Sequence, residues 1–390
     1  LDQGGATRST LARGGVKVPP AMAALVHGTC AHCRDFDDTF MDSVVHPGSV
    51  VVSTALAIAE ANNASNDDFI AAVTAGYEIA ARLGAVAGRR FHAHALHATG
   101  VIGPIAAAVT AGRLLRLNSQ QLTSAMGLAA SMSGGLMAFI VDGGWSKWLH
   151  GGWAAHGGIV AAELAARDFI GPAHSLDGGH DLYTALLQGE PVDRAPITAA
   201  LGTQWRGATA EFKYYPCAHV IQPYIDAVLA IVIEHDLRAS DVAAVECAIA
   251  PWAAAIVCEP AQATLRFDNQ LEAIASLPYQ LAVAITERGV GLSALAHTMR
   301  NRTDLHRLAG RITHRNDSAL GKNFDGAVIL RTTTGKSFER RATTPGLNPA
   351  KLADKYRAGV GPLNRQANDH VARLLADAGW RTAAAILGSA

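Results

Sequence analysis

Small apolar residues recur at helical spacing from residue 51 to residue 201. Alanine is abundant in this stretch, apolar positions repeat every three or four residues, and β-branched alternation is nearly absent. The pattern is clearest in "NDDFIAAVTAGYEIAARLG" (66–84), "NSQQLTSAMGLAASM" (118–132) and "GGWAAHGGIVAAELAARDF" (151–169). Because small side chains let helices approach closely, we expect a compact, nearly all-helical domain up to about residue 205.

Polar residues mark the expected helix ends. Asn66, followed by two aspartates, is typical of a helix N-cap with an acidic first turn, and Gly84 is a typical stop. Asn118 marks a similar start.

The pattern changes near residue 205. Segments 241–251 and 326–335 alternate with period two and are rich in β-formers, and a helical segment, 269–289, lies between them. The last stretch, from about 368, is helical again. We therefore predict a mainly α protein with a helical domain over 1–205, a smaller α+β lid domain over 206–360, and C-terminal helices over 361–390 that return to the helical domain.

Composition narrows the functional classes. The 390 residues are 49% hydrophobic and 17% charged, which is typical of a globular chain with a large core. Lys+Arg and Asp+Glu balance at 33 each, so nucleic acid and membrane surfaces are not expected partners. Five cysteines, an odd and small number, favour a reducing, cytoplasmic location. The chain starts without Met, so we expect that N-terminal residues precede it.

Acidic residues crowd "HCRDFDDTFMDSVVHPG" (32–48). If a helix began here, Asp35, Asp38, Thr39 and Asp42 would share one face. Such a face can be merely solvated or can line a site.

Two histidine segments and an isolated lysine are further candidates. "FHAHALHATG" (91–100) places histidines before a helix start, where they can be neutral site residues or ordinary surface residues. In "DGGWSKWLHGGWAAHGG" (142–158), Lys147 and His150 are one helical turn apart, among glycines that suit either a ligand or tight helix packing. Lys213 lies near the point where the helical pattern gives way to the mixed pattern, and clefts tend to form at domain junctions.

Two other motifs do not suffice for a cofactor site. Cys30-x-x-Cys33 with His32 lacks the second ligand pair of a tetrahedral zinc site, and no phosphate-binding glycine loop follows a strand. We therefore expect neither a metal nor another cofactor.

Several segments together resemble the MmgE/PrpD family, which includes 2-methylcitrate dehydratase, cis-aconitate decarboxylase and iminodisuccinate epimerase. The matching pieces are "AALVHGTCAHCRDFDDT", "HPGS", "GYEIAARLG", "HATGVIGPIAAAVTAGRLL", "SKWLHGGWAAHGGIVAAELA", "KYYPC" and "SLPY". They occur in the family's order over most of the chain.

The resemblance implies a homodimer whose active site lies between a helical domain and a lid. It implies the catalytic residues Asp35, His46, His97, Lys213 and Tyr279, and the substrate-binding residues Thr39 and Lys147, to which we add the neighbouring His150 and His219. The lysines can pair with substrate carboxylates, and the histidines suit proton transfer at neutral pH.

The chain departs from decarboxylase-like members at three points. The stretch from Thr39 to His46 is one residue longer, Ala218 replaces a histidine with His219 beside it, and Gln222 replaces another common histidine. These changes weaken the assignment to a decarboxylase or to a strict methylcitrate dehydratase.

The first expectation is a metal-independent hydro-lyase that removes water from, or adds it to, a small di- or tricarboxylate after proton abstraction α to a carboxylate. Epimerisation of a dicarboxylate begins with the same proton abstraction, and decarboxylation of a cis-aconitate-type acid is a further alternative. A non-enzymatic binding protein on the same fold is the remaining alternative.

Overall fold

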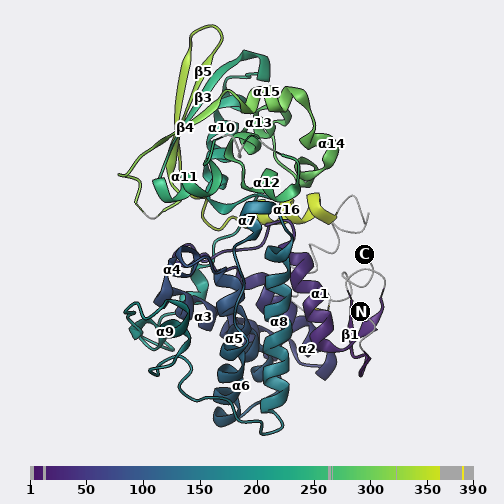
Figure 1. Ribbon diagram of the computed structural model, residues 1–390. Coiled ribbons are helices and arrows are strands. Elements are labelled where there is room, and N and C mark those ends of the chain that lie inside the picture. The colour runs from purple at the N-terminus through teal and green to yellow at the C-terminus, as the bar shows by residue number, and fades with distance from the viewer. Residues whose placement is uncertain are drawn as a thin grey trace. The chain divides into compact units, whose positions relative to one another are not determined.

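A computed structural model describes residues 4–11, 15–261, 265, 267–321, 323–360 and 380–381. The chain divides into two compact units (Figure 1). The helical unit comprises Leu1–Cys33, Asp37–Glu211 and Val360–Ala390, and the mixed unit comprises Arg34–Phe36 and Phe212–Gly359. The chain passes from the helical unit to the mixed unit between Glu211 and Phe212, and Arg34–Phe36 also belongs to the mixed unit. The predicted C-terminal helices over 361–390 lie outside the described residues, apart from Trp380 and Arg381.

The helical unit is built from long helices and a short N-terminal hairpin. Its α-helices are α1 (Pro20–His32), α2 (Pro47–Asn62), α3 (Asn66–Ala87), α4 (Arg90–Ala93), α5 (Ala98–Leu114), α6 (Ser119–Ser131), α7 (Phe139–Asp142), α8 (Ser146–Ala165) and α9 (Leu182–Leu186). The 3-10 turns η1 (Ala195–Ile197) and η2 (Arg206–Thr209) follow, and β1 (Ser9–Thr10) pairs antiparallel with β2 (Lys17–Val18).

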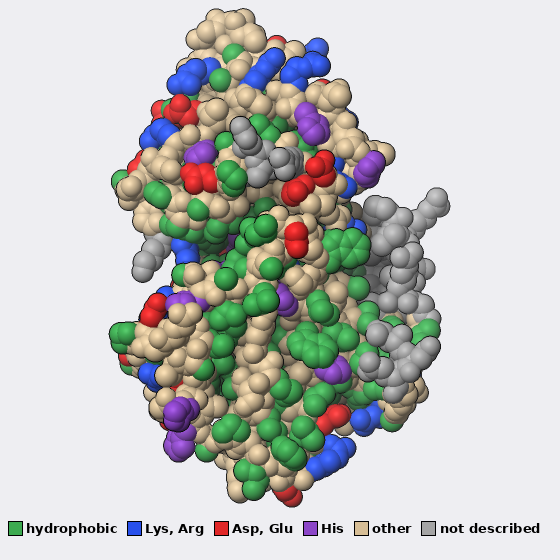
Figure 2. All heavy atoms as spheres, viewed as in Figure 1, with side chains coloured by type: hydrophobic (Ala, Val, Ile, Leu, Met, Phe, Trp, Pro, Cys, Tyr) green, Lys and Arg blue, Asp and Glu red, His purple; other side chains and the backbone are tan. Residues whose placement is uncertain are grey.

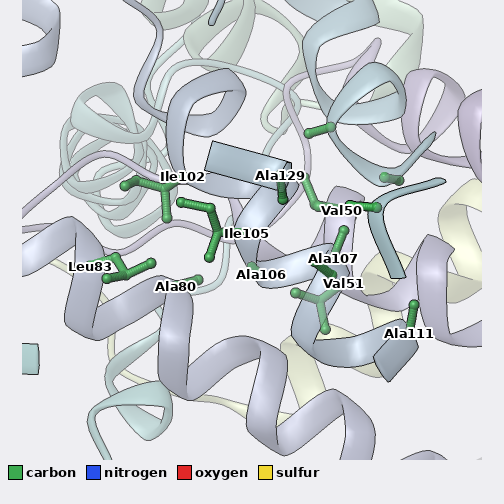
Figure 3. Packing of buried hydrophobic residues seen from close by; sticks show 14 of the residues in the cluster. Val50, Val51, Ala80, Leu83, Ile102, Ile105, Ala106, Ala107, Ala111 and Ala129 are labelled. Carbon is green, nitrogen blue, oxygen red and sulfur yellow. The ribbon is translucent and has the colours of Figure 1, made fainter. Parts of the chain in front are cut away.

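Small residues form the core of the helical unit. Figure 3 shows Val50 and Val51 of α2 close to Ala106 and Ala107 of α5, in a cluster of fully buried side chains. Helix α8 approaches α1 so closely that a Cβ at Gly152 would lie 2.1 Å from the main-chain oxygen of Leu25. Only glycine permits this spacing, which confirms that the small residues serve tight helix packing.

Helix α3 (Asn66–Ala87) is long and apolar enough to cross a membrane by length and composition alone. Half of its most apolar window is buried inside the unit, where α3 packs against α5. Core helices pass the same test, so this is weak evidence for a membrane span.

The helix boundaries differ from the prediction in three respects. Helix α3 continues past Gly84 to Ala87, and Gly88 is its C-cap residue. Ser65, not Asn66, is the N-cap of α3, because the Ser65 hydroxyl accepts the Asp68 amide. Beyond α8 the chain up to Glu211 is mostly turns, with only short helices among the described residues. The Gly, Pro and Asp residues of "GPAHSLDGGHD" (171–181) account for this, because they favour turns over a continuous helix.

The mixed unit combines one sheet with short helices. The sheet has the order β4-β3-β5-β6, in which β3 and β4 are parallel and the other neighbours are antiparallel. Its strands are β3 (Val242–Ile249), β4 (Ile312–Asn316), β5 (Gly326–Thr332) and β6 (Ser337–Ala342). Its helices are η3 (His219–Ile221), α10 (Gln222–Glu234), η4 (Ala239–Asp241), α11 (Pro251–Val257), α12 (Gln270–Ala275), α13 (Leu277–Glu287), η5 (Leu292–Leu295), α14 (His297–Arg300), α15 (Thr303–Ala309) and α16 (Pro349–Val360).

The predicted elements of the mixed unit are present. Strands β3 and β5 cover most of the two β-rich segments, and helices α12 and α13 divide the helical segment 269–289. The break falls at Ser276, whose hydroxyl accepts the Tyr279 amide and starts α13, with Pro278 in its first turn. The chain is thus mainly α with a smaller α+β unit, as predicted.

Candidate active site

The acidic segment after α1 is not a helix, which corrects the prediction for residues 35–46. Helix α1 ends at His32, and Asp35 adopts a left-handed φ of 48°. Thr39 then forms a β-bridge with Glu211, and Phe40 forms one with Val45. The side chains expected on one helix face therefore separate.

Each acidic side chain has its own surroundings. Asp38 accepts the Gly48 amide at 2.8 Å and the Tyr77 hydroxyl at 2.7 Å, so it fixes the start of α2. Asp42 is exposed. Asp37 contacts His32, and Asp35 belongs to the mixed unit.

His46 is the N-cap residue of α2 and is buried. Its Nδ1 lies 2.9 Å from the main-chain oxygen of Asp38 and 3.0 Å from the Thr39 hydroxyl. Because a carbonyl oxygen only accepts, this geometry assigns the proton to Nδ1 and leaves Nε2 as the basic nitrogen of the neutral ring. Thr39, a predicted site residue, therefore orients His46.

His46 belongs to a group of imidazoles inside the helical unit, which we call the histidine cluster: His32, His46, His92, His97 and His150. Ring centroids lie 4.9 Å apart for His32 and His46, 5.5 Å for His32 and His97, and 6.1 Å for His46 and His97. His92 and His150 flank His97 at 6.0 and 5.2 Å. The structure thus brings together three predicted site histidines, namely His46, His97 and His150, with two that were not predicted as catalytic or substrate-binding residues.

His97 is the N-cap residue of α5, as its place before a helix start had indicated. Its Nδ1 lies 3.0 Å from Nδ1 of His150, so one of the two nitrogens donates. Burial lowers the pKa of His97 well below its usual value, and electrostatic interaction with His32 and Lys147 lowers it further. His97 is therefore a neutral imidazole at neutral pH.

Lys147 is buried in the first turn of α8, one turn before His150. Burial, followed by electrostatic interaction with His32 and Lys147, lowers the pKa of His150 to about 4. Burial, followed by Lys147 and Arg89, lowers the pKa of His92 to about 4. Lys147 thus supplies positive charge next to imidazoles that stay neutral, a combination suited to an anionic ligand.

Sequence reasoning gave His32 no role in acid–base chemistry. The residue is fully buried, and its Nδ1 lies 2.8 Å from Oδ2 of Asp37. Its position three residues before Asp35 was considered only as part of the Cys30-x-x-Cys33 motif. Placement of His32 beside His46 depends on the turn that follows α1, and no local pattern encodes that turn.

The same residues offer ligand atoms for a metal ion. Atoms of His32, Asp37 and His46 lie within 4.8 Å of one another. In the arrangement described, Nδ1 of His32 and Nδ1 of His46 face oxygen acceptors, which assigns protons to both nitrogens. A metal-free site stays a prediction.

The mixed unit contains a second group of predicted residues. Nζ of the fully buried Lys213 lies 2.7 Å from Oδ1 of Asp35 and 3.0 Å from the Asp35 main-chain oxygen. Lys355 donates to the main-chain oxygens of Phe36 (2.5 Å) and Lys213 (2.9 Å). Lysine contacts thus hold Arg34–Phe36 against the segment that begins at Phe212.

The segment after Lys213 contains two of the three departures from the family pattern, Ala218 and Gln222. Gln222 is fully buried, accepts the amides of Tyr214 (2.9 Å) and Tyr215 (3.0 Å), and donates to the Tyr215 oxygen (2.8 Å). Its amide therefore orders the loop next to Lys213 and is not available for acid–base chemistry. The Ala218 amide donates to the oxygen of Ile274, and the methyl side chain of Ala218 has no acid–base function.

His219, beside Ala218, is buried against Phe324, with ring centroids 5.1 Å apart. Neither ring nitrogen has a hydrogen-bond partner among the described residues. Burial, followed by the charge of Lys213, lowers the pKa of His219 to about 3. His219 is thus a neutral imidazole near the Lys213–Asp35 pair.

Tyr279 is in the interior of the mixed unit. Its hydroxyl donates to the Ala294 oxygen at 2.6 Å, and its ring lies 4.6 Å from that of Phe267. Burial raises the pKa of Tyr279 to about 12. These contacts give Tyr279 a packing role, and its predicted catalytic role stays a prediction.

The fold and side chains define a mainly α protein whose helical unit encloses the histidine cluster together with the buried Lys147. The chain belongs to the MmgE/PrpD family: the MmgE/PrpD N-terminal domain matches residues 1–195, and the MmgE/PrpD C-terminal domain matches residues 215–376. The resemblance recognised from the sequence is thereby confirmed.

Several relatives of the chain are named for the same activity, decarboxylation of cis-aconitate. The chain is 34% identical to human cis-aconitate decarboxylase over 172 residues, which are 42% of this chain and 34% of the relative. It is 29% identical over 223 residues to the cis-aconitate decarboxylase-like protein oryM of Aspergillus oryzae (53% of this chain, 46% of the relative). It is 25% identical over 225 residues to cis-aconitate decarboxylase of Aspergillus terreus (55% and 46%). The matches span less than half of each relative's length.

Proposed function

We propose that the protein is a lyase that acts on a small di- or tricarboxylate through proton abstraction α to a carboxylate. One observation carries this proposal: neutral imidazoles and the buried Lys147 are enclosed together in the helical unit. Membership of the MmgE/PrpD family and the similarity to cis-aconitate decarboxylases support a carboxylate substrate.

The reaction divides into two tasks. A lysine ammonium group pairs with a substrate carboxylate and stabilises the negative charge that appears when the α proton leaves. A neutral imidazole whose Nδ1 is already hydrogen-bonded accepts that proton on Nε2. His46 is one imidazole in this state, because the Asp38 main-chain oxygen and the Thr39 hydroxyl hold its Nδ1.

Dehydration, in which the C–O bond breaks after the α proton has left, is the first candidate reaction. Decarboxylase-like members carry histidines where this chain has Ala218 and Gln222, and the amide of Gln222 is used to order its own loop. A site without these two histidines favours dehydration over a decarboxylation that uses them. The resulting activity is that of a metal-independent hydro-lyase.

Decarboxylation is the second candidate, because the relatives described above are named for it. Epimerisation of a dicarboxylate requires the same proton abstraction and no bond cleavage beyond it. A purely binding role is the non-enzymatic alternative.

An exchange experiment tests the proposal. The protein is incubated in deuterium oxide with a panel of di- and tricarboxylates that includes citrate, 2-methylcitrate and cis-aconitate, and NMR follows deuterium uptake, alkene formation and carbon dioxide release. We expect deuterium uptake together with alkene formation for at least one hydroxy acid.

Each result has a distinct meaning. Carbon dioxide release would replace dehydration by decarboxylation, and exchange with inversion alone would replace it by epimerisation. Absence of any exchange or turnover across the panel would contradict the enzymatic proposal. His46→Ala should lower kcat by about 10²–10⁴, whereas His174→Ala, at an exposed position, should not.

We also propose that the protein is a cytoplasmic homodimer. Hydrophobic side chains gather on the visible face of the helical unit, over α8 (Figure 2). Trp145, Leu149 and Trp153 follow each other at intervals of four residues, and their exposed fractions are 72%, 45% and 54%. An apolar stripe of this kind suits a second copy of the chain.

A further inference from the structure

We propose that His32 and Asp37 form an acid–base dyad, in which His32 accepts the substrate proton and Asp37 holds His32 in the required tautomer. This inference rests on the proposed function, because it names the residue that carries out its proton transfer. It assigns roles to two residues that sequence motifs left without any.

The first support is the hydrogen bond between the two side chains. His32 is the last residue of α1, has no exposed surface, and places Nδ1 2.8 Å from Oδ2 of Asp37. A carboxylate only accepts hydrogen bonds, so Nδ1 carries the proton and Nε2 holds the lone pair of the neutral ring. Asp37 is itself nearly buried, with 7% of its side chain exposed, so solvent screens this contact weakly.

The second support is the state of the opposite ring nitrogen. Nε2 of His32 is buried and has no hydrogen-bond partner among the described residues. A buried polar atom without a partner is energetically unfavourable, and such an atom in a native site indicates a catalytic role or a place for a ligand. The ring centroid of His32 lies 4.9 Å from that of His46 and 5.5 Å from that of His97, so this nitrogen is within the histidine cluster.

Comparison with the neighbouring imidazoles indicates a division of roles. Nδ1 of His46 contacts a neutral carbonyl oxygen and a hydroxyl group, and the nearest oxygen of Asp37 is 4.0 Å away. His97 shares a hydrogen bond with His150, and burial with nearby positive charge keeps it neutral. A hydrogen-bonded carboxylate stabilises an imidazolium better than a neutral acceptor does, so a new positive charge is best held on His32.

The chemical step balances within the site and its substrate. The C–H bond α to the substrate carboxylate breaks, a bond from that proton to Nε2 of His32 forms, and the electron pair remains on the substrate. In dehydration this pair expels the β-hydroxyl group, which leaves as water after it takes one proton from a second acid. His32 then returns its proton to that acid or to solvent.

Two variants test the dyad. In His32→Asn the amide nitrogen can occupy the place of Nδ1 and keep the bond to Asp37, but nothing replaces Nε2. We expect solvent deuterium to enter the substrate about 10²–10⁴-fold more slowly, with KM changed less than threefold. Asp37→Asn should also lower kcat, and thermal unfolding should show that this variant stays folded.

The matched control is a pair of the same type outside the cluster. His174 and Asp177 are exposed, with Nδ1 3.1 Å from Oδ1, and His174→Asn should leave the rate of deuterium exchange unchanged. A second readout needs no substrate. In ¹⁵N NMR of the imidazole rings, the signal lost in His32→Asn should belong to an Nδ1-protonated tautomer, and Asp37→Asn should shift it toward the Nε2-protonated form.

Several results would overturn the dyad. Exchange in His32→Asn at the wild-type rate, or a His32 signal from the Nε2-protonated tautomer, would do so. Zinc that is retained by the wild-type protein and lost in His32→Asn would identify His32 as a metal ligand instead. If the wild-type protein exchanges deuterium with no acid, the proposed function fails with the dyad, whereas exchange in both wild type and His32→Asn overturns the dyad alone.

Discussion

Nζ of Lys213 lies 2.7 Å from Oδ1 of Asp35, and both side chains are buried in the mixed unit. Breaking a buried pair leaves an uncompensated charge, so Lys213→Met should lower the free energy of unfolding by about 3–5 kcal/mol. Urea denaturation measures the loss.

The double variant Lys213→Met/Asp35→Asn should recover much of this loss, because neither charge then remains buried alone. The control is Lys351→Met, which removes a half-exposed lysine from its pair with Asp226 and should cost about 1 kcal/mol or less. Equal losses in Lys213→Met and Lys351→Met would contradict the prediction.

Lys147 should influence both catalysis and the titration of its neighbours. Lys147→Met removes a positive charge that lowers the pKa of His92 and of His150, so both pKa values should rise from about 4 toward 6.5. Loss of a charge-assisted bond to a substrate carboxylate should raise KM by about 10–150-fold, which corresponds to about 1.5–3 kcal/mol. NMR titration and kinetics measure the two effects. Lys336→Met, at an exposed turn, should change neither.

Stability should fall as the pH is lowered from about 6.5 to about 4. The folded-state pKa of His92 is about 4 and that of His219 about 3, both below the usual value of 6.5. Over this range the unfolded chain therefore binds protons that the folded chain does not. Each such histidine contributes a slope of up to about 1.4 kcal/mol per pH unit.

His219→Phe isolates one contribution to this slope. The variant keeps an aromatic ring next to Phe324 and removes the titrating group, so its stability should fall less between pH 6.5 and pH 4.5 than that of the wild-type protein. Urea denaturation at several pH values measures the difference. A slope identical to the wild-type slope would show that the pKa of His219 is the same in the folded and unfolded states, and would contradict the prediction.

The apolar stripe on α8 should determine the oligomeric state. Trp153→Glu places a charge in the middle of the stripe and should convert a dimer into monomers, as measured by light scattering after size exclusion. Ile256→Glu changes a residue of similar exposure, 47%, in the mixed unit and should leave the dimer intact. A wild-type protein that is monomeric at micromolar concentration would exclude the homodimer.

Chelation should not affect activity. The proposed chemistry uses imidazoles, carboxylates and lysines, so the rate after dialysis against EDTA should equal the rate before it. Loss of activity together with one equivalent of zinc or iron, followed by recovery when the metal is added back, would contradict a metal-independent mechanism.

The sequence predicted those features that depend on local patterns. Periodic apolar residues indicated α3, α6 and α8, and the turn from Lys147 to His150 followed directly from helical spacing. Alternating residues indicated β3 and β5. The helical interpretation of segment 35–46 was wrong, although the spacing of its acidic residues fits a helix. In the structure this segment forms turns and two isolated β-bridges, one of them with the distant residue Glu211.

The histidine cluster shows why a site of this kind is only partly predictable. His46 and His97 were expected from family motifs, and both are N-cap residues of helices. His32 has a different origin, because it enters the cluster from the C-terminal end of α1 and depends on how α1, α2 and α5 pack. Tertiary packing of this kind leaves no periodic signal in the sequence.

The Lys213–Asp35 pair has a practical consequence for dissecting the protein. Its two partners are 178 residues apart in the chain, so the mixed unit is not a contiguous gene segment. A fragment that starts at Phe212 and ends at Gly359 would retain the whole sheet but leave Lys213 buried without its carboxylate. Such a fragment would need Arg34–Phe36 as well, and a gene that fuses this tripeptide to Phe212 in place of residues 37–211 would supply it.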